Sequence, residues 1–135
     1  MAHASIPPLL PMPQKSAFTG KYVKADVPVN EKIVSHIDGA IFQDEAYHIL
    51  ITSKGVNIEA TTPRGLYWAR QTMAQLTTDK KGKQLLPLCE ITDWPAFRIR
   101  GYMHDIGRSY IPVDELKAEI AMLSRFKINT FHWHL

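Results

Sequence analysis

The chain has 135 residues, of which 45% are hydrophobic and 21% charged, with a formal net charge of +3 at pH 7. This length suits one ordinary domain and the composition is that of a globular protein. The small, scattered basic excess argues against a nucleic-acid partner, and no apolar run approaches the roughly 20 residues of a membrane-spanning helix. Cys89 is the single cysteine, so no internal disulfide forms, and we expect a buried thiol rather than a nucleophile.

Residues 1–15 contain Pro7, Pro8, Pro11 and Pro13, which predict an extended lead-in without a helix. The segment Ala2–Ala4 resembles the end of a signal-peptide cleavage site, although the start lacks a charged region and a long apolar one. Residues 16–27 predict a strand bent at a glycine. Residues 27–45 are expected to be mostly loop.

The clearest strand pattern follows. Residues 46–52 and 56–60 alternate apolar and polar side chains around the turn at 53–55, which predicts a β-hairpin. Residues 61–78 then predict a helix that begins at a threonine cap and Pro63. Its apolar face comprises Leu66, Ala69, Met73 and Leu76. Residues 16–86 therefore predict a small α+β domain, an antiparallel sheet with a covering helix.

Residues 87–97, with Pro87 and Pro95, are expected to be a linker. After it the pattern changes to a strand over 97–105, a helix over 113–127 and a second strand over 130–135. A helical connection between two strands predicts a right-handed βαβ unit with parallel strands. Two parallel strands and one helix leave apolar edges open, so we expect this segment to be the first part of a larger α/β fold.

One group of motifs is more specific. Arg100, Gly101, Asp105, Arg108 and Tyr110 follow the pattern R-G-x-x-x-D-x-x-R-x-(Y/F), and after the predicted helix come K-x-N at residues 127–129 and H-W-H-L at residues 132–135. With "GLYWARQTMAQL" at residues 65–76, these motifs resemble glycoside hydrolase family 20, the β-N-acetylhexosaminidases. The resemblance implies that the α+β domain precedes a (β/α)₈ TIM barrel, of which residues 98–135 form the first strand, helix and second strand.

The same resemblance implies removal of terminal β-linked N-acetylglucosamine or N-acetylgalactosamine from a glycan or chitooligosaccharide, without a cofactor. In this family the 2-acetamido oxygen of the substrate attacks the anomeric carbon, an aspartate orients it, and an adjacent glutamate is the general acid. That carboxylate pair comes from a later barrel strand. We therefore expect no catalytic residue in this chain, which alone would be inactive without the remainder of the barrel. The resemblance further implies a periplasmic or extracellular location.

Three residues are candidates for substrate binding. The resemblance assigns Arg100 to the hydroxyls of the terminal sugar, a task that suits the fixed donor fork of a guanidinium. Asp105 ends the first predicted strand, where barrel active sites are built, but it could instead pair with Arg108. His134 would lie at the floor of the sugar pocket, or would be a hydrogen-bonded core residue as we expect for His132.

Two alternatives stay open. An H-x-H pair on a barrel strand is also typical of metal-dependent amidohydrolases, and His132 and His134 point to the same side of their strand. The other histidines show no ligand-like spacing, so we expect no metal site. The second alternative is that the chain is a stand-alone α+β binding or interaction module.

Overall fold

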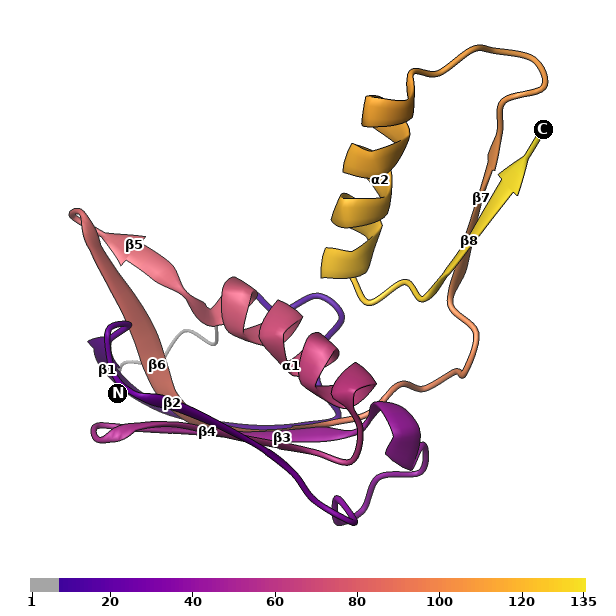
Figure 1. Ribbon diagram of the computed structural model, residues 1–135. Coiled ribbons are helices and arrows are strands. Elements are labelled where there is room, and N and C mark those ends of the chain that lie inside the picture. The colour runs from indigo at the N-terminus through magenta and orange to yellow at the C-terminus, as the bar shows by residue number, and fades with distance from the viewer. Residues whose placement is uncertain (1–7) are drawn as a thin grey trace. The chain divides into compact units, whose positions relative to one another are not determined.

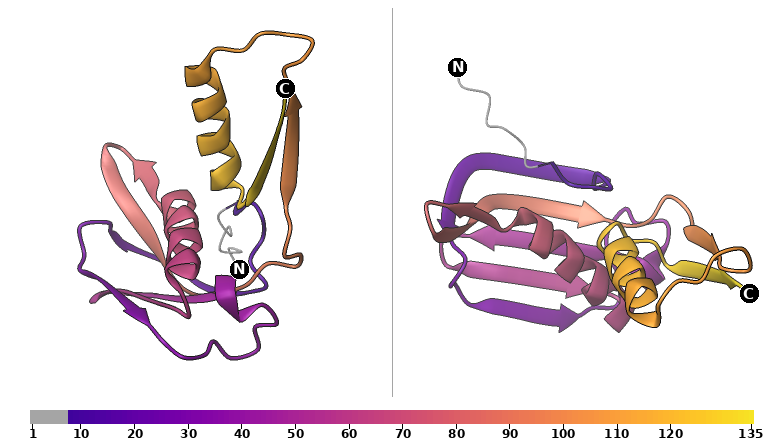
Figure 2. Two further views of the ribbon diagram at one scale, coloured as in Figure 1. Left: turned by 45° about the vertical axis from the view of Figure 1, so that its right-hand side comes forward. Right: turned by 90° about the horizontal axis from the view of Figure 1, so that it is seen from above.

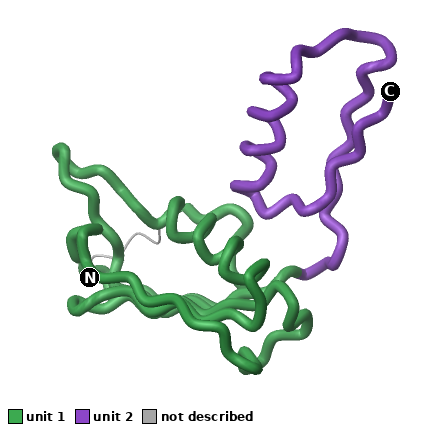
Figure 3. The backbone as a smooth tube through the Cα atoms, viewed as in Figure 1, with its two compact units in different colours: residues 1–95 green, residues 96–135 purple. Residues whose placement is uncertain are grey.

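A computed structural model describes residues 8–135 of the chain. The chain divides into two compact units, one ending at Pro95 and the other formed by residues 96–135 (Figure 3). Among the described residues, neither helix has the length and apolar character to cross a membrane. The expected extended conformation of residues 1–7 and the cleavage-like Ala2–Ala4 lie outside the described part.

The first unit contains a six-stranded sheet (Figure 1). The main strands lie in the order β1 (Lys15–Lys24), β6 (Lys83–Asp93), β3 (Tyr47–Thr52), β4 (Gly55–Ala60) and β2 (Val29–Ile33), and β5 (Thr78–Lys80) pairs with β6. All pairs are antiparallel except β2 with β4, which is parallel. The sheet is therefore mixed, and the prediction of a purely antiparallel sheet was wrong at this edge.

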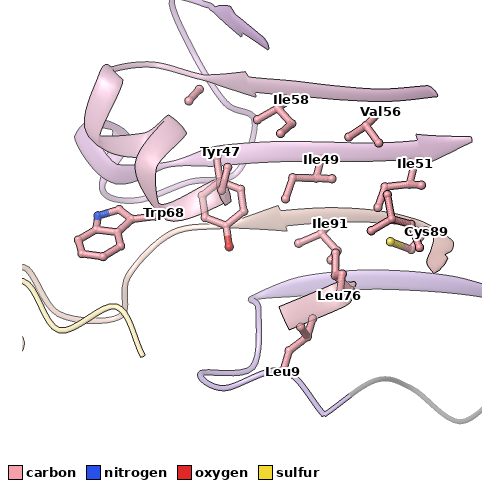
Figure 4. Close-up of a cluster of buried hydrophobic side chains, with 13 residues drawn as sticks. Leu9, Tyr47, Ile49, Ile51, Val56, Ile58, Trp68, Leu76, Cys89 and Ile91 are labelled. Atoms are coloured by element: carbon pink, nitrogen blue, oxygen red, sulfur yellow. The ribbon is translucent and has the colours of Figure 1, made fainter. Parts of the chain in front are cut away.

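The predicted hairpin and helix are confirmed. In β3 and β4 buried and more exposed side chains alternate, because successive residues of a strand face opposite sides of the sheet. Helix α1 (Pro63–Leu76) begins at Thr62, whose side chain accepts a hydrogen bond from Gly65 N. The helix lies along one face of the sheet (Figure 2). Between them lies the core (Figure 4), formed by residues that include Tyr47, Ile49, Ile58, Leu76 and Ile91.

The segment before β1 is tied to this core. Leu9 is buried within it, and the backbone of Leu10 exchanges two hydrogen bonds of 2.8 Å with the side-chain amide of Gln75 on α1. Strand β1 bends as predicted: Gly20 has a φ of 78°, and the pairing with β6 shifts between Phe18 and Tyr22. A positive φ is readily adopted by glycine, which allows the bend.

Two predictions of irregular structure were wrong. Strand β2 lies in the expected loop 27–45, which also contains the short 3₁₀ helix η1 (Gln43–Glu45). Strand β6 extends to Asp93 through most of the expected linker 87–97 and pairs with both β1 and β3. Pro87 is tolerated within β6 because its partner on β1 is Tyr22, the residue at which the pairing resumes after the register shift.

The second unit is a βαβ unit, as predicted. Strand β7 (Gly101–Asp105) and strand β8 (Thr130–His134) are parallel, and helix α2 (Val113–Arg125) connects them. Its only buried side chains among residues 96–135 are Leu116 and Lys127. Large apolar side chains such as Ile99, Met103, Trp133 and Leu135 are exposed. This unit therefore has almost no core of its own.

Candidate functional site

The two strands of the second unit present two chemically different faces. Register partners in adjacent strands share a face, and Met103 pairs with His132 and Asp105 with His134. The alternate residues, including Tyr102 and His104, face helix α2, because both interact with Glu119 of that helix. The face that bears Asp105, His132 and His134 is thus the one turned away from α2.

Asp105 and His134 meet at the carboxyl end of the strands. They are register partners, and Ile106 N donates to His134 O over 3.0 Å, so the chain after β7 is held beside the end of β8. The rings of His132 and His134 lie edge to face with centroids 6.2 Å apart. Both histidines are exposed in this chain. The shared register face agrees with their predicted position on one side of the strand, and the core role expected for His132 and considered for His134 stays a prediction.

Asp105 does not form the ion pair that was the alternative to a binding role. Its Oδ1 accepts a hydrogen bond of 2.8 Å from Gly107 N. Within the described residues, no nitrogen of Arg108 lies within 4.0 Å of the Asp105 carboxylate. A side chain on Gly107 would approach that oxygen to 3.2 Å, so glycine here lets the loop turn closely around Asp105.

Arg100 lies at the other end of the strand pair. It precedes the first residue of β7, about 16 Å along the strand from Asp105 at the usual rise per residue. Its Nε donates to Lys127 O over 2.7 Å and its Nη1 to Phe97 O over 2.8 Å. The structure therefore brings Asp105 and His134 together but places Arg100 apart from them, with its guanidinium directed at backbone carbonyls.

The K-x-N motif explains how this end of the unit is built. Lys127 has a φ of 60°, and Ile128 N returns to Leu123 O, which ends α2 with a left-handed residue. Asn129 then joins the two strands, because its Oδ1 accepts from Arg100 N and its Nδ2 donates to Arg98 O. The motif thus fixes the chain reversal from helix to strand and positions Arg100.

A polar cluster on the α2 side of the strands was not predicted. His104 Nδ1 lies 2.6 Å from Glu119 Oε2, and both side chains are largely covered. A hydrogen bond with Glu119 also raises the pKa of Tyr102, whose ring stacks on that of Phe131. Because Glu119 lies 15 residues after His104 and on a helix, only the fold reveals that the two side chains meet. This cluster joins β7, α2 and β8.

Metal and thiol chemistry find little support in these residues. Across residues 8–135, no group of three or more histidine, cysteine, aspartate or glutamate side chains is placed to hold a metal ion. Cys89 is buried in the core of the first unit, and burial raises the pKa of its thiol to about 11. It is therefore a core residue, as predicted.

Comparisons with known proteins decide the family. The sequence model of glycosyl hydrolase family 20, domain 2, matches residues 11–94, and that of the catalytic domain of the same family matches residues 97–135. The chain belongs to glycoside hydrolase family 20. Family membership removes the main ground for the amidohydrolase interpretation of His132 and His134.

Among curated family 20 relatives, a β-hexosaminidase of Porphyromonas gingivalis is 34% identical over 80% of this chain, and a β-hexosaminidase of Vibrio furnissii is 37% identical over 67%. An N,N'-diacetylchitobiase of Vibrio harveyi is 30% identical over 90%. The aligned regions span only 14–15% of these three proteins. The chain therefore corresponds to a small part of its relatives' length.

Solved structures show the same relationship. The family 20 exo-β-N-acetylglucosaminidase of Vibrio harveyi, in complex with N-acetylglucosamine, aligns with all of this chain at a TM-score of 0.84 and 25% identity. The Streptomyces plicatus N-acetyl-β-hexosaminidase in complex with thio-NAglucal aligns with 79% of it at a TM-score of 0.69 and 30% identity. This chain covers 26% and 22% of those two chains.

Proposed function

We propose that this chain is part of a glycosidase that removes terminal β-linked N-acetylhexosamine from glycans or chitooligosaccharides. The observation that carries the proposal is the order of the two matches, with domain 2 of family 20 immediately followed by the catalytic domain. The names of its relatives include chitobiase and β-hexosaminidase, and one structural relative holds N-acetylglucosamine. The family resemblance is also the ground for expecting a periplasmic or extracellular enzyme.

Within that proposal, β7, α2 and β8 are the first strand, helix and second strand of a (β/α)₈ barrel. The parallel pairing of β7 with β8 and the helical crossover support this. In such a barrel the face turned away from the helices is the interior, which is the face of Asp105, His132 and His134. The exposed apolar residues of this unit, among them Met103 and Trp133, would be covered by the rest of the barrel.

The proposed mechanism needs a carboxylate pair that these residues do not supply. In the family the 2-acetamido group of the substrate is the nucleophile, so that an aspartate orients it and a glutamate protonates the leaving group. The chain has two adjacent Asp-Glu pairs, at residues 44–45 and 114–115. Glu45 of the first is 4% exposed in η1, and the second pair forms the first turn of α2. Neither pair is at the carboxyl end of a strand, so we expect the isolated chain to be inactive.

Substrate binding is the role proposed for this chain's own residues. Asp105 and His134 stand at the carboxyl end of parallel strands, where barrel enzymes place their sites. Arg100 is assigned to the sugar by the family resemblance, whereas its hydrogen bonds here support a role in holding the strand start. A binding role for Arg100 therefore requires its side chain to exchange these carbonyls for sugar hydroxyls.

The product of the whole protein tests the proposal. The whole gene product is incubated with a 4-nitrophenyl N-acetyl-β-glucosaminide, and the first-formed sugar is followed by proton NMR. The β-anomer of N-acetylglucosamine is expected first, and the matching β-glucoside, which lacks the acetamido group, should not react. Formation of the α-anomer first, or equal cleavage of the glucoside, would contradict the substrate-assisted mechanism.

A further inference from the structure

Arg100, which the family resemblance assigns to the sugar, lies at the point where the strand pairing of the second unit ends. The register of β7 with β8 begins at Gly101 and Thr130, and the backbone ladder reaches only the carbonyl of Arg100, which accepts from Thr130 N over 3.2 Å. The chain before β8 cannot continue this ladder, because Lys127 has a φ of 60°, outside the strand region. Other contacts must therefore hold the backbone of residues 98–100.

The side chain of Asn129 continues the pairing where the backbone does not. Its Oδ1 accepts from Arg100 N over 2.9 Å, and its Nδ2 donates to Arg98 O over 2.7 Å. In a parallel ladder, a residue opposite Ile99 would make the same two bonds through its backbone, donating to the carbonyl before Ile99 and accepting from the N–H after it. The carboxamide of Asn129 therefore takes the place of a β8 residue opposite Ile99.

The chemistry of this contact requires a carboxamide. It needs a donor and an acceptor on one planar group, which asparagine and glutamine carry and an ionised aspartate does not. The orientation of the group is fixed in turn, because the Thr130 hydroxyl donates to Asn129 Oδ1 over 3.1 Å. The backbone N–H of Asn129 also donates to Arg100 O over 3.0 Å. One residue, 29 positions along the chain, thus binds both backbone polar groups of Arg100.

The guanidinium of Arg100 is directed by the same turn. Its Nε donates to Lys127 O over 2.7 Å, and its Nη1 donates to Phe97 O over 2.8 Å. The left-handed conformation of Lys127 sets the direction of that carbonyl. A displacement of the turn at residues 127–129 would therefore move the backbone of Arg100 and its side chain together.

We infer that Asn129 is a positioning residue for sugar binding, whose carboxamide fixes the backbone of residues 98–100 so that the guanidinium of Arg100 meets the hydroxyls of the terminal sugar. The inference rests on the proposed function and adds to it the residue that sets the geometry of Arg100. A planar fork of donors binds well only when it is aligned, so a small shift of its base weakens binding. Because Asn129 acts on the backbone, its role does not depend on which oxygen atoms the guanidinium binds.

Kinetics of an Asn129→Ala variant of the whole gene product test the inference. With 4-nitrophenyl N-acetyl-β-glucosaminide, KM should rise at least fivefold while kcat changes less than twofold, because the lost interaction is made equally before and in the transition state. The melting temperature of each variant is measured in parallel. Asn57→Ala is the matched control, since Asn57 is exposed on β4 in the first unit, and it should behave as the wild type.

A double-mutant cycle separates positioning from a general structural effect. When Asn129→Ala is added to Arg100→Lys, KM should rise less than twofold further, because a lysine has no planar fork to align. A purely structural role would raise KM by the same factor in both backgrounds. That result would overturn the inference, as would an unchanged KM in folded Asn129→Ala or in Arg100→Lys.

Asn129→Asp takes the place of Asn129→Ala if the alanine variant does not fold. It keeps an acceptor for Arg100 N and removes the donor to Arg98 O, and the same rise in KM and the same coupling are expected. If neither variant folds, Asn129 serves folding alone and the inference is overturned. An inactive wild-type protein would instead contradict the proposed function, so the two failures are distinguishable.

Discussion

The hydroxyl of Tyr47 donates a hydrogen bond of 2.7 Å to Asp93 Oδ2 inside the first unit. The same hydroxyl lies 2.6 Å from Thr72 Oγ1, and Asp93 Oδ1 accepts from Gln14 N over 3.1 Å. Tyr47, Thr72 and Asp93 are all buried. One polar cluster therefore joins β3, α1, β6 and the segment before β1.

Replacing Tyr47 by phenylalanine should destabilise the first unit by about 1–3 kcal/mol, because a buried carboxylate oxygen loses its donor while the ring is retained. The free energy of unfolding is measured by urea titration. Tyr67→Phe is the matched control, since Tyr67 is 41% exposed, and it should change stability by less than about 0.5 kcal/mol. A loss of unfolding free energy in Tyr47→Phe no larger than that in Tyr67→Phe would contradict a stabilising role for the cluster.

The stability that the Tyr47 cluster contributes should decrease at alkaline pH. Burial, followed by the charge of Asp93, raises the pKa of Tyr47 well above its usual value of 10.0. The unfolded chain therefore loses this proton first, so the stabilisation is complete below pH 10 and decreases as the pH rises above it. The stability difference between the wild type and Tyr47→Phe should shrink by up to about 1.4 kcal/mol per pH unit above pH 10. A constant difference from about pH 8 to about pH 11 would contradict this.

Gly65 provides a test of packing against helix propensity. A Cβ atom at this position of α1 would lie 2.5 Å from Ala46 O and 3.0 Å from the Ala60 side chain. Gly65→Ala should therefore destabilise the unit by about 1–3 kcal/mol, although alanine is the better helix former. Thermal unfolding measures the effect. The control is Ala74→Gly, at an exposed position of the same helix, where the lower helix propensity of glycine alone should cost about 1 kcal/mol. If Gly65→Ala instead stabilised the unit, the close contact at Gly65 would be disproved.

Most of the first unit was predictable where the signals are local. The hairpin and α1 follow from alternation, a glycine turn and a threonine cap, all of which act within a few residues. Strand β2 is exposed along its whole length and pairs in parallel with β4, so it has no apolar alternation to recognise. The second half of β6 resembles a linker because Pro87 interrupts it, and only the shifted register of β1 makes that proline acceptable.

The site was predictable to a lesser degree. The motif residues Asp105 and His134 are adjacent in the structure because a one-helix crossover places the ends of β7 and β8 together. The carbonyl partners of Arg100 are Phe97, 3 positions before it, and Lys127, 27 positions after it, and no sequence pattern specifies them. The same applies to the pair formed by His104 and Glu119.

Arg100→Lys in the whole protein separates its two possible roles. A lysine cannot reproduce the planar fork of donors, so a sugar-binding role predicts a KM at least tenfold higher with little change in the melting temperature. Arg64→Lys is the matched control, because Arg64 is exposed on α1 in the first unit, and it should behave as the wild type. A large fall in melting temperature without a change in KM would assign Arg100 to structure alone.

The central claim is that these residues form the small domain and the first βαβ unit of a hexosaminidase whose acid and orienting carboxylates lie elsewhere. It is tested most directly by comparing the 135-residue chain with the whole gene product on 4-nitrophenyl N-acetyl-β-glucosaminide at equal concentration. We predict rapid release of 4-nitrophenol by the whole protein and none above background by the chain. Clear turnover by the chain alone, or an inactive whole protein that is folded, would contradict the account.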